Sequence, residues 1–304
     1  MERILNLNKK AIVVTGATSG LGFETSAKLY QMGAHIIGVG RNEERCRVAK
    51  EKLMALKGSG EVDYVLADLS SLQQIDQLAK SIGNILGEGS LHALVNNAGA
   101  FSSYLSLTPE GHELQFAVNH LAPYYLTHHL MPYLQKAEDG RVVTVSSGSH
   151  YHARIHFKDV HLRRTYNPLT AYKQSKLANV MFTYDLNRRG LIPAYAADPG
   201  LVNTDIGLKQ ATGIANLVWR LRQRHGAPAS KGCLTSVHLA SKPNSTLQPH
   251  IYYRDCQPKV QDKYATRAME CNRLWALSAK MCGIKEDGYG MLSKDQTKGE
   301  YHAG

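Results

Sequence analysis

The stretch Lys10-Ala-Ile-Val-Val-Thr15-Gly16-Ala-Thr-Ser-Gly20-Leu-Gly22 decides the fold of this chain. Its first six residues form a short, apolar and β-branched run, as in a strand that is buried on both faces of a parallel sheet. Three glycines follow, and a helical pattern then runs from Phe23 to Met32 and ends at Gly33. The stretch therefore predicts a strand, a glycine-rich turn and a helix in immediate succession.

The glycine turn has the chemistry of a pyrophosphate site. Gly16, Gly20 and Gly22 remove side chains, so the backbone can approach a ligand, and the helix that follows offers free N–H groups and a partial positive charge. Their spacing, Gly-x3-Gly-x-Gly, differs from the general dinucleotide fingerprint Gly-x-Gly-x-x-Gly. A glycine-rich turn without a ligand is the alternative, and residues elsewhere in the chain must decide between the two.

Strand and helix patterns alternate along the rest of the chain. Short crossovers of this kind make a parallel sheet that is covered on both faces, with ligands at the carboxyl ends of its strands. We therefore predict an α/β fold over residues 1–304: one domain with a Rossmann-type, doubly wound parallel sheet, three layers (α/β/α) and a small helical substrate lid. The predicted strands cover residues 10–15, 34–40, 62–68, 91–96, 141–147 and 194–198, and the predicted helices cover 23–32, 43–57, 72–86, 113–133 and 171–189.

Composition narrows the class of protein. Of the 304 residues, 43% are hydrophobic, and the formal net charge is +11. An excess of positive charge is typical of proteins that bind nucleic acid, an anionic membrane surface or an anionic ligand, and also of proteins that simply have a soluble basic surface. No run of Lys and Arg resembles a nucleic-acid-binding arm, so we expect no nucleic-acid partner.

The cysteines and the apolar runs of the sequence indicate in which cellular compartment the protein is expected. Five cysteines are scattered without a CxxC pattern, which favours reduced thiols. Residues 1–10 lack the apolar core of a signal peptide, and no run of about 18 apolar residues exists to span a membrane. We expect a cytoplasmic protein, with peripheral contact to a membrane and association into homo-oligomers left open.

The end of the second predicted strand indicates which dinucleotide is bound. An acidic residue there accepts from the 2′-hydroxyl of NAD, whereas an arginine accommodates the 2′-phosphate of NADP. The chain has Gly40-Arg41-Asn42 and no carboxylate, so Arg41 favours NADP(H); a solvated loop arginine is the alternative. Asp68 is placed to contact the adenine amino group, and Asn96-Asn-Ala-Gly99 ends the fourth strand, where adenine and ribose would lie.

Tyr172 and Lys176 are the candidate acid/base pair. Four residues separate them on a predicted helix, so both side chains lie on one face. A nearby ammonium stabilises a phenolate, which lowers the pKa of the tyrosine towards the working pH. Tyr172 would then donate a proton to a carbonyl or take one from an alcohol, and Lys176 would also hold the nicotinamide ribose. By itself this spacing is common among ordinary exposed helix residues.

Two further polar residues support that pair. Ser146 and Ser147 end the fifth strand, and a hydroxyl there, preferably that of Ser147, would hold the substrate oxygen in place; a turn serine is the alternative. Asn119 lies inside a helical pattern although asparagine is a poor helix former. We expect it to bend the helix and hold a water that relays protons to Lys176, the alternative being a tolerated polar residue.

Two histidine-containing stretches do not match known metal-binding motifs. Gly111-His-Glu-Leu-Gln-Phe116 begins like the zinc motif HExxH, but Phe116 occupies the position of the second histidine. His150, His152, His156 and His161 cluster after the fifth strand with spacings that fit no familiar metal set. We predict no metal site.

Together these motifs resemble the signature set of the short-chain dehydrogenase/reductase superfamily over nearly the whole chain. The matching positions are Thr15–Gly22, Asp68, Asn96–Gly99, Asn119, Ser147, Tyr172, Lys176 and Asp198-Pro-Gly-Leu-Val-Asn-Thr204. The phrase Tyr172-Lys-Gln-Ser-Lys-Leu-Ala-Asn-Val-Met-Phe-Thr, the long insertion between Ser147 and Tyr172, and Arg273-Leu-Trp-Ala-Leu-Ser278 are similar to the retinol dehydrogenase-related branch. One departure is Asp198, which precedes Pro-Gly where the retinoid enzymes have histidine or a similar residue.

The resemblance implies an NADP(H)-dependent oxidoreductase that acts on CH–OH donors. It would interconvert an alcohol with a ketone or aldehyde on a small apolar substrate (retinoid, steroid, other lipid or polyketide-like), with Tyr172, Lys176, Ser147 and Asn119 as the catalytic set. An NADP(H)-binding sensor or scaffold without turnover is the alternative. The implied cofactor-binding residues are Gly16, Thr18, Ser19, Gly20, Leu21, Gly22, Arg41, Asp68, Leu69, Asn97, Ala98, Gly99, Tyr172, Lys176, Pro199, Val202 and Thr204.

The substrate lid is expected over about residues 205–226, and a C-terminal tail over about 285–304. Ile214, Leu217, Val218 and Leu221 recur at helical spacing among arginines, which predicts a basic amphipathic helix. Such a helix would cover an apolar substrate, rest on a membrane surface or pack on the core.

Overall fold

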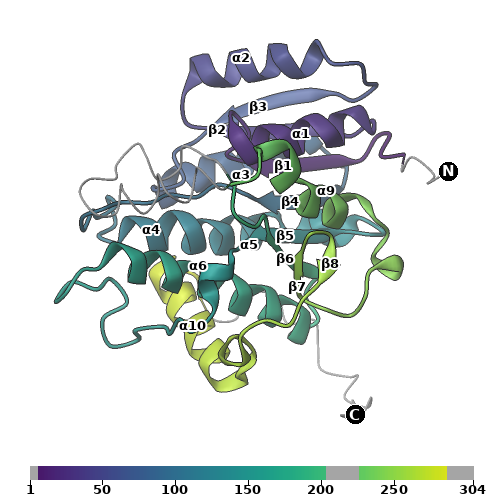
Figure 1. Ribbon diagram of the computed structural model, residues 1–304. Coiled ribbons are helices and arrows are strands. Elements are labelled where there is room, and N and C mark those ends of the chain that lie inside the picture. The colour runs from purple at the N-terminus through teal and green to yellow at the C-terminus, as the bar shows by residue number, and fades with distance from the viewer. Residues whose placement is uncertain (1–5, 203–225, 286–304) are drawn as a thin grey trace.

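A computed structural model describes residues 6–202 and 226–285. Within them the chain forms one sheet with the strand order β3-β2-β1-β4-β5-β6-β7-β8 (Figure 1). All neighbouring strands are parallel except β7 and β8. The strands are β1 (Ala11–Thr15), β2 (His35–Gly40), β3 (Val62–Leu66), β4 (Leu91–Asn96), β5 (Arg141–Val145), β6 (Ala194–Asp198), β7 (Tyr252–Arg254) and β8 (Gln257–Pro258).

The strand order reverses between β1 and β4. The chain moves outward from β1 through β2 to β3, and then crosses back to place β4 on the other side of β1. Val13 pairs with Ile37 of β2 and with Leu94 of β4, so β1 lies at the centre of the sheet. A ligand site is expected at the carboxyl ends of the strands beside this reversal. The predicted doubly wound parallel sheet is confirmed.

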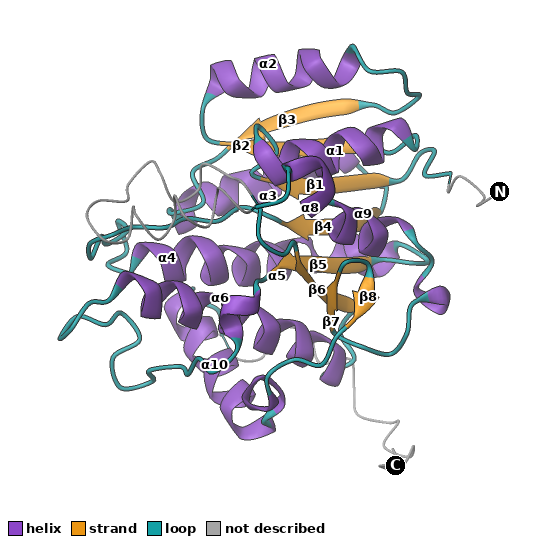
Figure 2. Cartoon of the chain, in the orientation of Figure 1, coloured by secondary structure: helices purple, strands orange, loops and turns teal. Residues whose placement is uncertain are grey.

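Helices cover both faces of the sheet (Figure 2). One apolar cluster joins the sheet to α3, α5, α6 and α10, and a second joins the opposite face to α1, α2 and α9. The helices are α1 (Gly20–Gln31), α2 (Glu43–Met54), α3 (Leu72–Leu86), α4 (Leu114–Phe116), α5 (Ala122–Lys136), α6 (Pro168–Arg188), α8 (Ala229–Gly232), α9 (Leu234–Ser241) and α10 (Ala268–Met281). None of the helices in these ranges is both long and apolar enough to cross a bilayer.

Element boundaries differ from the sequence prediction by a few residues at several ends: α1 begins at Gly20, α2 ends at Met54 and α6 begins at Pro168. β3 and β5 each end two residues early, at Leu66 and Val145, because their last predicted residues turn away into loops. The helix predicted over 113–133 begins with a single turn, α4, passes through a π-helix over Ala117–Leu121 and continues as α5. Pro123 has no N–H to donate to the Asn119 carbonyl four residues earlier, so the α-helical ladder is interrupted there.

Several predicted features lie outside the described residues. These are nearly all of the lid expected over 205–226, the tail beyond residue 285, and Thr204 of the implied cofactor site. Val202, another residue of the implied cofactor site, is described and forms an isolated bridge with Ala227, which joins the end of the β6 segment to the start of α8.

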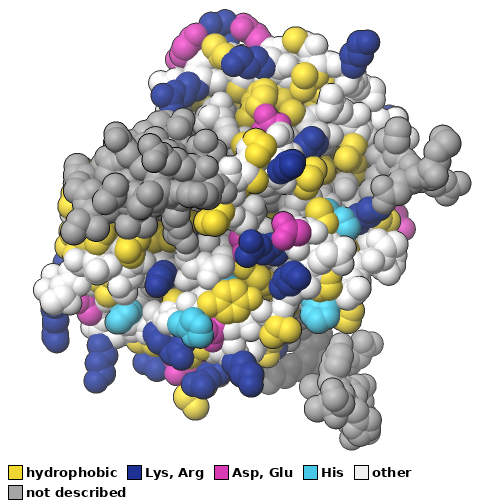
Figure 3. Space-filling model, in the orientation of Figure 1, with side chains coloured by type: hydrophobic (Ala, Val, Ile, Leu, Met, Phe, Trp, Pro, Cys, Tyr) yellow, Lys and Arg dark blue, Asp and Glu magenta, His cyan; other side chains and the backbone are white. Residues whose placement is uncertain are grey.

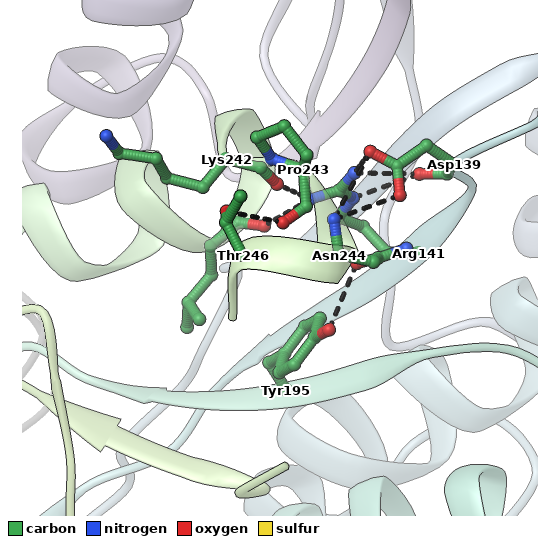
Figure 4. Close-up of polar contacts among 8 residues, drawn as sticks. Asp139, Arg141, Tyr195, Lys242, Pro243, Asn244 and Thr246 are labelled. Carbon is green, nitrogen blue, oxygen red and sulfur yellow. Dashed lines mark hydrogen bonds and ion pairs between the residues drawn. The ribbon is translucent and has the colours of Figure 1, made fainter. Parts of the chain in front are cut away.

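At the amino ends of the strands, a buried arginine ties three segments together (Figure 4). The Arg141 side chain, 0% exposed, donates to the Leu239 carbonyl at 3.2 Å and to the Lys242 carbonyl. It also donates to the carboxylate and the carbonyl of Asp139. Asp139 in turn accepts from the Asn244 N–H at 3.1 Å, so β5 is joined to the chain that leaves α9.

Replacing Arg141 with methionine should destabilise the fold strongly. The substitution leaves the Asp139 carboxylate and three carbonyls without their buried partner, and breaking a buried pair in this way costs about 3–5 kcal/mol. The free energy of unfolding, measured by urea titration, should fall by that amount. Arg47→Met is the matched control, because Arg47 is an exposed arginine that pairs with Glu44 and Glu51. An equal effect in the two variants would contradict the role given to Arg141.

Candidate active site

The glycine turn after β1 brings bare backbone to the carboxyl end of the sheet. Gly16 has φ +66° and Gly20 has φ +53°, a region that favours glycine. A Cβ on Gly22 would lie 2.2 Å from the Gly16 carbonyl oxygen and 2.5 Å from Asn97 Nδ2. The turn therefore accepts no side chain at Gly22, and α1 begins here with free N–H groups, as a pyrophosphate site requires.

The Thr15 hydroxyl locks this turn to the loop after β4. Its oxygen accepts from the backbone N–H groups of Asn97 at 3.0 Å and Ala98 at 2.9 Å. The Asn97 side chain donates back to the Thr15 carbonyl at 2.8 Å. Two predicted parts of the cofactor site, Gly16–Gly22 and Asn97–Gly99, are thus held as one unit. The sequence placed Thr15 in a motif but did not predict this contact. The clue that could have predicted it was a threonine, which has a hydroxyl, at the end of an inner strand.

Arg41 lies at the exposed end of β2, directly before the residue that caps α2. Beside it, a Cβ on Gly40 would lie 2.5 Å from Thr18 Cγ2, so Thr18 packs on the strand end. Asp68 lies beyond the end of β3, and its carboxylate accepts from the Ser70 N–H at 2.9 Å. Arg41, Thr18 and Asp68 therefore follow the same edge of the sheet as the glycine turn.

Lys176 is buried at the carboxyl end of β5. Its side chain is 4% exposed, and Nζ donates to the Val145 carbonyl at 3.0 Å. Burial lowers the pKa of Lys176 to about 8, and the charge of Asp198 acts in the opposite direction. Nζ lies 5.7 Å from the centroid of the Tyr172 ring, so the predicted pair does share one face of α6. Tyr172 is half-buried and packs edge-on against Phe101, with 6.1 Å between ring centroids.

The two serines at the end of β5 point to different partners. Ser146 is buried, and its hydroxyl donates to the Lys176 carbonyl at 2.9 Å. Ser147 is half-buried, and among the described residues its hydroxyl bonds to Ser149, donating to that hydroxyl and accepting from that N–H, each at 3.2 Å. Of the two, Ser147 is the hydroxyl that a ligand can reach.

Asn119 connects the π-helix to the loop after β4 and to α6. Its side-chain oxygen accepts from the Ala100 N–H at 2.6 Å, and Nδ2 donates to the Ala100 carbonyl at 3.1 Å and to Ser175 Oγ at 2.9 Å. Ser175 donates to the Tyr172 carbonyl at 2.8 Å. The side chain of Asn119 thus joins the Ala100 backbone to Ser175, whose hydroxyl holds the Tyr172 carbonyl, while Pro123 leaves the Asn119 carbonyl without its α-helical donor.

Away from these residues, the described part of the chain (6–202 and 226–285) has a cavity lined in part by polar residues but no group of side chains that would hold a metal. No group of three or more His, Cys, Asp or Glu side chains there is arranged to hold a metal ion. A cavity of about 390 Å³ lies at the amino ends of β5 and β6, the edge opposite the motifs, and its lining includes Gln135, Asn187 and Asn244. On the face shown in Figure 3, Lys and Arg side chains are spread over many elements rather than gathered into one patch.

Comparison with protein families gives a match over most of the chain. The model of the short chain dehydrogenase family matches residues 10–213. Human retinol dehydrogenase 11 is 32% identical over 286 residues, covering 93% of this chain and 89% of the relative. Human polyprenol dehydrogenase is 31% identical over 289 residues, covering 90% and 86%.

Solved structures agree with the fold. A crystal structure of an uncharacterised protein from Mycobacterium paratuberculosis is 30% identical, covers 93% of this chain and 97% of its own, and superimposes with a TM-score of 0.71. A short chain dehydrogenase from Shigella flexneri, crystallised with NADP, superimposes with a TM-score of 0.64 at 21% identity, covering 83% and 98%.

Thr15→Val tests whether the Thr15 hydroxyl holds the glycine turn against the loop after β4. The change keeps the shape of the side chain but leaves the N–H groups of Asn97 and Ala98 without an acceptor, which costs about 1–3 kcal/mol. We expect that loss in the free energy of unfolding, together with weaker NADPH binding by fluorescence titration.

Thr144→Val is the matched control for that variant. Thr144 is a buried threonine of β5 whose hydroxyl oxygen has no hydrogen-bond partner among the described residues. Its replacement should therefore leave stability nearly unchanged. If Thr15→Val has the same stability and the same cofactor affinity as Thr144→Val, the Thr15 hydroxyl does not hold the two loops together.

Proposed function

This chain belongs to the short chain dehydrogenase family, and from that premise we propose that it is an NADP(H)-dependent oxidoreductase. It would interconvert an alcohol with a ketone or aldehyde on an apolar substrate. The observation that carries the proposal is the Tyr172–Lys176 face of α6. It lies at the carboxyl end of β5 beside Ser147, on the same sheet edge as the glycine turn that follows β1.

The described residues fit a dinucleotide. Gly16, Gly20 and Gly22 leave the backbone bare at the N-terminus of α1, where phosphates bind well. Asn97, Ala98 and Gly99, fixed by Thr15, would lie along the adenosine and ribose. Arg41 at the tip of β2 would pair with a 2′-phosphate, which is the reason to propose NADP(H) rather than NAD(H). Pro199 and Val202 follow β6 on the nicotinamide side.

Proton transfer would rest on the chain's own residues, since the bound nicotinamide supplies or accepts only the hydride. Tyr172 would give its phenolic proton to the substrate oxygen during reduction and take a proton from the alcohol during oxidation. The ammonium of Lys176 would stabilise the Tyr172 phenolate and so lower the free energy of removing its proton. Ser147 would donate to the same substrate oxygen and fix its position. Asn119 holds Ser175, whose hydroxyl donates to the Tyr172 carbonyl, and the Asn119 carbonyl, to which Pro123 has no N–H to donate, would accept from a relay water.

An apolar substrate suits the surroundings of Tyr172. The Tyr172 ring and Leu169 both pack against the buried Phe101, so the ring that carries the reacting hydroxyl sits in an apolar cluster. The relatives named above are dehydrogenases of retinol and of polyprenol. We therefore propose a retinoid, another isoprenoid or a similar lipid as the substrate class, with steroids and polyketide-like carbonyls as further members of the same apolar group.

Tyr172→Phe tests the chemistry. Loss of the hydroxyl removes the proton donor, and general acid–base catalysis of this kind contributes about 10²- to 10⁴-fold to the rate. Oxidation of NADPH with all-trans-retinal or another apolar carbonyl should slow by that factor, while NADPH affinity stays near that of the unaltered chain. Tyr184→Phe, twelve residues along α6, is the matched control. Near-normal turnover in Tyr172→Phe would exclude the mechanism, and NADPH binding without turnover on a broad carbonyl panel would favour a sensor.

Arg41→Ala tests the cofactor. A charged hydrogen bond to a phosphate is worth about 1.5–3 kcal/mol, so NADPH affinity should fall by about 10- to 100-fold while NADH affinity hardly changes. Titration of each cofactor by fluorescence measures both. Arg47→Ala, on the neighbouring helix α2, serves as the control for loss of one positive charge. Equal affinity of the unaltered chain for NADH and NADPH would remove the argument from Arg41.

A further inference from the structure

A buried glutamine connects the loop after β4 to the start of α6. Gln115 lies in α4, which packs beside α6 (Figure 1), and it is 0% exposed. Its Nε2 donates to the Ser102 carbonyl and to the Pro168 carbonyl, each at 3.2 Å. Ser102 follows Phe101 in the chain, and Pro168 precedes Leu169. One amide group therefore joins the backbone at Phe101 to the backbone at Leu169.

The residues brought together in this way lie against the ring of Tyr172. Phe101 is 2% exposed, and both Leu169 and the Tyr172 ring pack against it. The rings of Phe101 and Tyr172 meet edge-on, with 6.1 Å between their centroids. A ring that is packed in this way has a restricted orientation. The position of Phe101 therefore helps to set the direction in which the Tyr172 hydroxyl points.

Tyr166 and Glu113 fix the orientation of the Gln115 amide. Glu113 is 1% exposed, and its carboxylate accepts from the N–H groups of Gln115 at 3.0 Å and Phe116 at 2.7 Å. The Tyr166 hydroxyl donates to the same carboxylate at 3.0 Å. Because that donation uses the only phenolic hydrogen, the Tyr166 oxygen is left to accept from Gln115 Nε2 at 2.8 Å. Nε2 rather than Oε1 therefore faces the Ser102 and Pro168 carbonyls.

Stability of the core does not by itself account for a glutamine at this position. Oε1 of Gln115 is buried and has no hydrogen-bond partner among the described residues. A buried acceptor without a partner is unfavourable, whereas an apolar side chain of the same shape carries no such penalty. What an apolar side chain cannot provide is the pair of N–H groups that the Ser102 and Pro168 carbonyls share.

We propose that Gln115 is a positioning residue for Tyr172. By holding the Ser102 and Pro168 carbonyls at one amide group, it keeps the Phe101 ring against the Tyr172 ring and so fixes the place of the phenolic hydroxyl. Asn119 acts on the backbone of the same tyrosine, through Ser175, whereas Gln115 acts on its ring. The kinetic consequence rests on the proposed function, in which that hydroxyl transfers the proton.

The first test reads the place of the Tyr172 ring and needs no turnover. Gln115→Met keeps the length of the side chain and removes both N–H donors. The whole chain is labelled with ¹³C in its tyrosine rings, and the Tyr172 NMR signal is assigned by its loss in Tyr172→Phe. Phe101→Ala then shows how far the signal moves when the ring current of Phe101 is removed. We expect Gln115→Met to produce at least half of that movement, and an unchanged signal would overturn the proposal.

The second test reads the rate. A small displacement of a reacting group lowers the rate by up to about 100-fold, so kcat for retinal reduction should fall by about 10- to 100-fold in Gln115→Met. The KM for NADPH should stay unchanged, because the amide lies away from the glycine turn. In a Phe101→Ala background, Gln115→Met should cause no further loss of kcat, since the amide acts through Phe101. Losses that multiply in the double variant would overturn the proposal.

Gln174→Met is the matched control. Gln174 is also a buried glutamine, 1% exposed, but it donates to the Val160 carbonyl and accepts from the His156 N–H, each at 2.8 Å. These contacts hold the segment before α6 and not the loop at Phe101. The control should therefore leave the Tyr172 signal and kcat near those of the unaltered chain, even where it lowers stability. Effects as large as those of Gln115→Met would assign them to general loosening and overturn the proposal.

Folding failure and failure of the proposed function give different results. If Gln115→Met does not fold, Tyr166→Phe replaces it, because it removes only the hydroxyl that orients the amide. It should move the Tyr172 signal in the direction that Phe101→Ala gives, and an unmoved signal would overturn the proposal. If the chain binds NADPH but reduces no carbonyl, the proposed function fails, while the Tyr172 signal still shows whether Gln115 holds the ring.

Discussion

The burial of the Lys176 amine at the end of a parallel strand is the constraint on which the site depends. A lysine with 4% exposure needs polar surroundings to keep its charge: Nζ donates to the Val145 carbonyl at the end of β5, and the charge of Asp198 at the end of the adjacent strand β6 raises the Lys176 pKa against the effect of burial. Those strands can supply both because β5 and β6 run parallel and end at the same edge. The fold therefore gives the lysine its environment, and in the proposed mechanism the lysine would stabilise the Tyr172 phenolate.

The same edge gathers the cofactor side of the site. β1 and β4 are neighbours only because strand order reverses between them, and this brings the glycine turn against the Asn97 loop. The Thr15 hydroxyl then joins the two loops with two hydrogen bonds. Asn119 makes the corresponding connection on the other side, between the loop at Ala100 and α6. Hydrogen bonds from the side chains of Thr15 and Asn119 to the backbone thus fix the cofactor side and the Tyr172 side of the site.

Local patterns were enough to predict the fold and to nominate the site residues. Six strands and most helices follow from apolar runs, and Tyr172 and Lys176 share a face because the helical period requires it. The π-helix was missed because its cause is a lost hydrogen bond at Pro123 rather than a change in hydropathy. β7 and β8 are too short to give a period. The contacts of Thr15, Asp198 and Tyr252 join residues 54 to 83 positions apart, which no local pattern reveals.

The central claim is that this site moves a hydride between nicotinamide and an apolar carbonyl. The most direct measurement uses NADPH carrying deuterium on the transferred position of nicotinamide C4, with all-trans-retinal as the acceptor, and mass spectrometry of the alcohol formed. We expect one deuterium, bound to the carbinol carbon, in each product molecule from the unaltered chain. Product without deuterium, when both C4 positions have been labelled in turn, would contradict it.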